Sequence, residues 1–200
     1  MLRSRWTRAA GYAAPGLVLA GAGLAHPLAL APGTAPWWTL LHVFLLPAFP
    51  LLAAAQWLML SDAPAALRRP GRLAAFGFAA FYGGLDAVAG ISAGTVVHAQ
   101  HAVTPVTGAV FAIGDTLGHL GAACFLAANV LVIAEVARRA SWRAAPGAVL
   151  VLAASVSFYD SHIFWPRGVL TMLAVAAGMF LLSLASETRP GQAVPVFTSS

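Results

Sequence analysis

Histidine and aspartate residues lie within long apolar stretches of this sequence, at spacings that could bind a metal or move protons. Asp115 and His119 are four residues apart in GDTLGHLG, and Asp86 lies in the preceding stretch FYGGLDAVAG. Residues four apart share one face of a helix, and a carboxylate bonded to one imidazole nitrogen raises the basicity of the other. Imidazole and carboxylate suit zinc, copper or iron. We therefore predict a transition-metal site of His42, Asp86, Asp115 and His119, or a haem held by His42 and His119.

Five other polar residues are secondary candidates for this site. They are His26, His98, His101, Asp160 and His162. The pair His98 and His101 has the i, i+3 spacing that binds metal on a helical turn, but no carboxylate supports it. Histidines near a membrane surface also reach water or lipid headgroups without any ligand, and that interpretation stays open for this group.

The composition indicates a protein of the membrane. Hydrophobic residues make up 60% of the 200 residues and charged residues only 8%, with a mean hydropathy of +0.82. A soluble domain carries about 25% charged residues, so 17 charged side chains could not cover a soluble surface of this size. All 11 basic residues are Arg, a bias that we take as the mark of a GC-rich, bacterial genome. The class that fits is an all-α integral membrane protein.

Six apolar segments are long enough to cross a bilayer, which takes about 20 residues. They span residues 9–31, 37–60, 73–97, 107–137, 146–163 and 168–186, and a loose polar tail follows over residues 187–200. The connections are short, so one bundle of six transmembrane helices is predicted over residues 1–186. The first segment also imitates a signal peptide; Pro32 directly after the Ala29–Ala31 stretch favours an uncleaved helix.

Charge and tryptophan placement orient this bundle. With six crossings, ten of the 11 arginines fall on the side that holds both termini, and only Arg167 falls on the other. Arginine is enriched in cytoplasmic loops, so both termini are predicted to be cytoplasmic, in a multi-pass protein of the inner or plasma membrane. All six tryptophans fall near predicted helix ends, as aromatic belts do. The arginine-rich face should attract anionic lipids, and nothing indicates nucleic acid.

In this orientation the candidate site faces outward. At about 1.5 Å per residue, all six histidines and three of the four aspartates fall in the outer half of the bundle. An aspartate near the centre of a spanning helix costs about 2.5–3.5 kcal/mol, so such residues usually face the bundle interior and have partners there.

Small residues indicate which segments pack together. Gly90 and Gly94 follow Asp86 at four-residue intervals, and Gly114 and Gly118 have the same spacing in the next apolar segment. Such rows let helices approach closely, so the third and fourth segments are predicted to pack against each other near the acids.

Several functions remain open at this point. A metal or haem site comes first, and the alternatives are a small proton-coupled transporter, a membrane enzyme acting on an apolar or lipid substrate, and a structural accessory protein. The sequence has no HExxH, GxSxG or glycine-rich phosphate loop, so no motif identifies a reaction.

Overall fold

The computed structural model describes residues 2–187, and within that range the chain is helical with short connections and no strand. The elements are α1 (Leu2–Leu24), α2 (Ala35–Met59), α3 (Ala65–Leu85), the π-helix η1 (Asp86–Ser92), α4 (Ala93–Gln100), α5 (Pro105–Ala140), the 3-10 turn η2 (Ser141–Ala144), α6 (Ala145–Ser161) and α7 (Arg167–Ser186). The all-α class is confirmed for this range. Apart from Glu187, the predicted loose tail lies outside the described residues.

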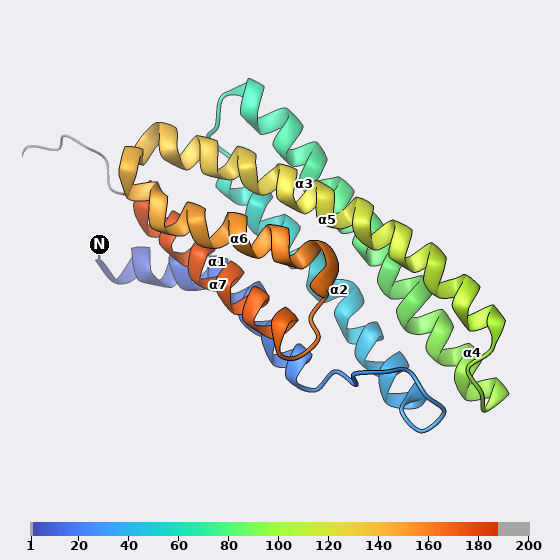
Figure 1. Cartoon of the computed structure of the whole chain (residues 1–200). Coiled ribbons are helices and arrows are strands. Elements are labelled where there is room, and N and C mark those ends of the chain that lie inside the picture. Colours follow the sequence, from blue (N-terminus) through green and yellow to red (C-terminus); the bar gives the residue numbers. More distant parts are fainter. Residues whose placement is uncertain (1, 188–200) are drawn as a thin grey trace, which may run out of the picture.

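Four helical segments of the described chain are long and apolar enough to cross a membrane. They are Ala35–Met59, Ala65–Gln100, Pro105–Ser161 and Arg167–Glu187. The third contains α5 and α6, which run in opposite directions on either side of η2 (Figure 1). The number of crossings and the orientation of the termini stay predictions.

Consecutive long helices run in opposite directions (Figure 1), so the α1–α2, α4–α5 and α6–α7 connections lie on one side of the bundle. The continuous rod Ala65–Gln100 and helix α5 each have 36 residues. At about 1.5 Å per residue each is about 54 Å long, against a hydrocarbon core of about 30 Å. Both rods are therefore longer than a bilayer requires.

Two of the predicted segments, 9–31 and 73–97, have clearly different bounds in the structure. Helix α1 ends at Leu24, not near Ala31, because Pro27 and Pro32 lack the amide hydrogens that a continuing helix needs. The third segment is helical from Ala65 through Gln100, well beyond 73–97, because hydropathy marks only the apolar part of a longer rod. His26 consequently lies in a loop after α1.

Glycines of α5 bring it close to α3 and η1. A Cβ at Gly114 would lie 2.4 Å from the Ala89 Cβ, and one at Gly121 would lie 2.9 Å from the Tyr82 backbone nitrogen. Contacts this close leave no room for a larger side chain. The predicted packing between the third and fourth apolar segments is confirmed.

Gly90 and Gly94 face a different neighbour. A Cβ at Gly90 would lie 2.2 Å from Cδ2 of His42, and one at Gly94 would lie 2.3 Å from Oγ1 of Thr39. The glycine row that follows Asp86 therefore packs on α2 rather than on α5. This contact carries His42 into the interior of the bundle.

A buried polar network, separate from these glycine contacts, joins α2, α5 and α6. Gln56 Nε2 donates to Asn129 Oδ1 at 2.8 Å, and Asn129 Nδ2 donates to Ser155 Oγ at 2.9 Å. Ser155 Oγ in turn donates to the Val151 carbonyl at 2.7 Å. Hydrogen bonds of this kind hold helices together where apolar surroundings offer no other partner. The residues of this network are structural rather than part of the metal candidate.

Large apolar side chains are exposed along the long helices. Examples are Leu40 of α2 at 59%, Leu73 of α3 at 71% and Val156 of α6 at 63% exposure. Soluble monomers rarely expose wide apolar surface, so these faces are suited to lipid.

Candidate metal centre

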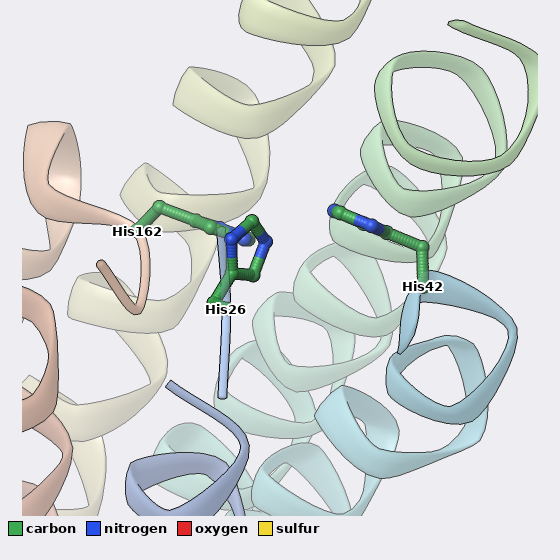
Figure 2. Close-up of side chains that lie close together, drawn as sticks. All are labelled: His26, His42 and His162. Atoms are coloured by element: carbon green, nitrogen blue, oxygen red, sulfur yellow. The ribbon is translucent and has the colours of Figure 1, made fainter. Parts of the chain in front are cut away.

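Three histidines from separate parts of the chain converge at one side of the bundle. His26 lies in the loop after α1, His42 in α2 and His162 directly after α6. Their ligand nitrogens, one from each ring, all lie within 4.8 Å of one another. His42 and His162 point toward each other from opposite sides, and His26 lies between them (Figure 2). We call this group the three-histidine cluster.

The rings are held by their packing. The His42 and His162 rings are parallel to within 4°, with centroids 6.2 Å apart. The His26 ring is nearly perpendicular to both, at 5.0 Å and 5.6 Å. Trp38 and Phe164 pack on His26 at 4.9 Å and 4.5 Å. His26 is 5% and His42 2% exposed, so aromatic side chains shield the cluster.

Each ring uses its Nδ1 atom in a hydrogen bond, which leaves Nε2 as the atom free to bind a metal. His42 Nδ1 lies 2.7 Å from the Trp38 carbonyl, and His26 Nδ1 lies 2.7 Å from the Pro27 carbonyl. A carbonyl can only accept, so both rings carry hydrogen on Nδ1. His162 Nδ1 lies 2.8 Å from the Tyr82 hydroxyl. Metal-binding histidines almost always have such a partner on the second nitrogen.

The spacing suits a small metal ion after a modest contraction. Three atoms no more than 4.8 Å apart lie within about 2.8 Å of a common centre, whereas Zn–N bonds are about 2.0–2.1 Å. Each nitrogen would therefore move inward by at most about 0.7 Å. Rotation of an imidazole about its Cβ–Cγ bond is soft, so movements of this size need no change in the helices.

Close backbone contacts place His26 and His162. A Cβ at Gly23 would lie 2.3 Å from the Ile163 carbonyl oxygen, and one at Gly168 would lie 2.5 Å from the Ile163 Cα. These glycines let the end of α1 and the start of α7 press against the segment after α6. His162 itself has φ 45°, a region that costs a residue other than glycine about 1–3 kcal/mol. Backbone strain of this kind is concentrated at functional sites.

Asp86 is a buried carboxylate without a partner. Its exposed fraction is 0%, and neither carboxylate oxygen has a hydrogen-bond partner among the described residues. It begins the π-helix η1, and π-helical turns often mark functional sites. Tyr82 lies four residues before Asp86 and contacts His162. Gly90 lies four residues after Asp86 and contacts His42. Asp86 is thus between two residues of the same helical rod that contact the cluster.

Burial controls the charge of the two loop histidines. It lowers the pKa of His26 to about 4. Burial also lowers the pKa of His162 well below its ordinary value, and the neighbouring His26 and His42 lower it further. At neutral pH both rings are neutral, the form in which imidazole binds a metal.

A pocket of about 280 Å³ lies beside the cluster and is lined by three of the other predicted residues. Asp115, His119 and Asp160 line it, together with Tyr82 and His162. A smaller pocket of about 100 Å³ is lined by Asp115, His42 and His162. Asp115 and His119 are exposed, and the His119 ring packs on Tyr159 at 4.8 Å.

The structure therefore groups the predicted residues differently from the sequence. His42 joins His26 and His162, two secondary candidates, while Asp115 and His119 line the pocket beside that cluster rather than belonging to it. Asp160 pairs with Arg167 at 2.6 Å. His98 and His101 lie 6.2 Å apart between ring centroids, exposed at the end of α4, and belong to no group of three metal-binding side chains within residues 2–187.

One signal in the sequence pointed to this cluster. His26, His42 and His162 all lie near the predicted outer ends of their segments, so the predicted topology alone put them at a similar depth in the membrane. The missing information was which helices are neighbours, and the close contacts of Gly23, Gly90 and Gly168 supply it.

No protein-family model, curated protein or solved structure matches this chain. The described chain is an apolar helical protein with a histidine cluster that could hold a metal.

Proposed function

We propose that this protein is an integral membrane metalloprotein that binds one zinc-like transition-metal ion through Nε2 of His26, His42 and His162. The observation that carries the proposal is the convergence of three imidazoles from three separate elements, with Nδ1 already hydrogen-bonded in each. Three protein ligands leave a fourth position for water or substrate, which is the arrangement of catalytic zinc sites.

Asp86 supports a positive charge at this site. A buried carboxylate without a partner is costly in apolar surroundings, and a metal cation nearby would offset that cost. A carboxylate beside the metal can also accept a proton from bound water. Asp86 is not one of the three converging side chains; its place on the helix between Tyr82 and Gly90, which contact His162 and His42, makes it the candidate to balance the charge of the centre and to accept a proton.

A metal ion fits the cluster better than a haem does. Trp38, Phe164 and the three imidazoles pack against one another at centroid distances of 4.5–6.3 Å, and a porphyrin needs a flat slot that these side chains occupy. His119, the other predicted haem ligand, lies outside the cluster. The haem alternative is the less favoured one.

The adjoining pocket favours a membrane enzyme as the specific form of this function. A metal with an open position lowers the pKa of bound water and polarises carbonyl oxygens, and the 100 Å³ pocket lies against two of the three ligands. Metal-assisted attack of water on an apolar substrate is thus the second, more specific candidate function.

We also propose six crossings of the cell membrane, with both termini and the anionic lipid contacts at the cytoplasmic face. The cluster then lies near the outer surface. In a Cys124→Ala background, a cysteine at Ala102, in the α4–α5 connection, should react with an impermeant thiol reagent on intact cells. A cysteine at Ala66, on the opposite side of the bundle, should react only after lysis. The reverse pattern would overturn the orientation.

Metal analysis of the purified protein tests the proposal directly. The protein in detergent should contain about one zinc-like ion per chain, and His26→Ala, His42→Ala or His162→Ala should abolish it. The double variant His98→Ala, His101→Ala is the matched control and should keep the metal. A metal-free wild-type protein that also fails to take up Zn²⁺ or Co²⁺ would refute the proposal, and a Soret band would show a haem in its place.

A further inference from the structure

A groove between α5 and α6 leads from the surface of the bundle to the three-histidine cluster. Its walls include Asp115 and His119 of α5 and Tyr159 of α6, and it also reaches Tyr82 and His162. We call this the α5–α6 groove. The smaller pocket that contains His42 shares Asp115 and His162 with it. The two spaces therefore meet at a residue of the cluster.

The groove opens among side chains that suit lipid. On α6, Tyr159 of the groove is itself 49% exposed, and Val156 is 63% exposed. Val156 lies three residues before Tyr159 and four before Asp160, so it shares their face of the helix. A molecule lying among the lipid chains beside α5 and α6 would have its polar end next to the groove.

The two carboxyl groups that line the groove differ in their partners. Asp160 is paired with Arg167 at 2.6 Å, whereas Asp115 has no ion-pair partner within the part of the chain that the structure describes. An unpaired carboxylate accepts hydrogen bonds from N–H and O–H groups. Asp115 lines both spaces, so a group bonded to it would lie between the surface and the metal ligands.

The size of the groove limits what enters it. Its volume of about 280 Å³ is below the range of about 300–1,000 Å³ that holds a drug-sized ligand. A polar end group fits, whereas a long hydrocarbon chain would remain outside, along the apolar faces of α5 and α6.

We propose that the α5–α6 groove admits a single-chain amphiphile from the lipid phase, whose polar end has an oxygen for the metal and an N–H group for Asp115. This inference rests on the proposed metal centre and names the class of molecule that reaches it. The hydrocarbon chain of the amphiphile would raise its affinity by lying in the lipid. Asp115 would select polar ends that carry an N–H group.

Alkyl hydroxamates test the groove because they carry both a metal-binding oxygen and an N–H group. The protein in lipid nanodiscs is loaded with Co²⁺, and the change in its visible spectrum is followed as dodecanohydroxamic acid or acetohydroxamic acid is added. His119→Trp narrows the groove and should weaken both probes at least tenfold, because the same hydroxamate end of each must pass through it. Thr116→Trp, exposed on the same helix but outside the groove, is the matched control and should change neither.

Asp115 is tested by a second comparison that does not depend on filling the groove. The wild-type protein should bind dodecanohydroxamic acid about tenfold more tightly than its N-methyl derivative, which lacks the N–H donor. Asp115→Leu should remove this preference.

The outcomes separate the two proposals. If Co²⁺ gives no spectrum with the wild-type protein, the metal centre itself is refuted. If Co²⁺ binds but His119→Trp weakens neither probe, or Asp115→Leu keeps the N–H preference, the groove proposal is overturned and the metal centre stands.

Discussion

Gly90 lies against His42 and so controls the place of this ring in the three-histidine cluster, and the substitution Gly90→Ala tests the proposed metal centre from this geometry. The added Cβ would lie 2.2 Å from Cδ2, 2.3 Å from Cγ and 2.6 Å from Cβ of His42. Ordinary contact begins at 3.4 Å, so the nearest His42 atom must move by about 1.2 Å. Because the Cβ of His42 is also too close, rotation of the ring cannot relieve the contact, and α2 must shift.

The expected result is a large loss of metal affinity with a small loss of stability. A shift of about 1.2 Å exceeds the adjustment of about 0.7 Å that the nitrogens need to bind zinc at its normal bond length. Loss of a supporting contact already weakens metal sites by about 10–100-fold, so we expect at least about 100-fold weaker Co²⁺ binding. Overpacking lowers the free energy of unfolding by about 1–3 kcal/mol, and replacing glycine by alanine within a helix raises it by about 0.5–1 kcal/mol.

Titration of the metal-free protein with Co²⁺, followed by its visible spectrum, measures this affinity. Gly21→Ala is the matched control, because nothing lies within 4 Å of a Cβ at that helical glycine, and it should bind Co²⁺ as the wild-type protein does. A Gly90→Ala protein with wild-type affinity would refute the placement of His42 at the metal.

Three further substitutions probe the groups around the centre. Tyr82→Phe removes the hydroxyl beside His162 Nδ1 and should weaken Co²⁺ binding about 10–100-fold; an unchanged affinity would show that this contact does not orient the ligand. Asp86→Leu removes a buried carboxylate without a partner. Thermal unfolding should therefore show the metal-free variant to be at least as stable as the metal-free wild type, while its metal affinity falls. A less stable variant with unchanged metal affinity would contradict the role assigned to Asp86. Gln56→Leu leaves Asn129 Oδ1 without its donor and should cost about 1–3 kcal/mol of stability without changing metal affinity, and a loss of metal binding would mean that the network reaches the site.

The sequence predicted the all-α class and one major packing contact because both depend on local patterns. Apolar segments mark helices by composition, and the glycines of α5 mark a close contact by their spacing. The spacing of a glycine row does not show which helix packs against it, however. The row at Gly90 and Gly94 packs on α2 rather than on α5, and that difference decides which histidine enters the interior.

The candidate site could be predicted by residue type and depth but not by grouping. The i, i+4 pair Asp115 and His119 shares a helix face, as its spacing requires, yet that face lines a pocket beside the cluster. His26 and His162 come from loops whose path depends on close backbone contacts and on a positive φ at His162. Neither feature has a periodic pattern, so the sequence could place these histidines only near the same surface.

X-ray absorption at the zinc edge tests the metal centre most directly. The zinc-loaded wild-type protein should show a first shell of three imidazole nitrogens at about 2.0–2.1 Å and one oxygen ligand, with outer-shell scattering from the imidazole rings. His26→Ala should lose one imidazole from that shell or lose the metal altogether, and the double variant His98→Ala, His101→Ala should match the wild type. A shell without three imidazoles, or one that His26→Ala leaves unchanged, would contradict the proposed centre.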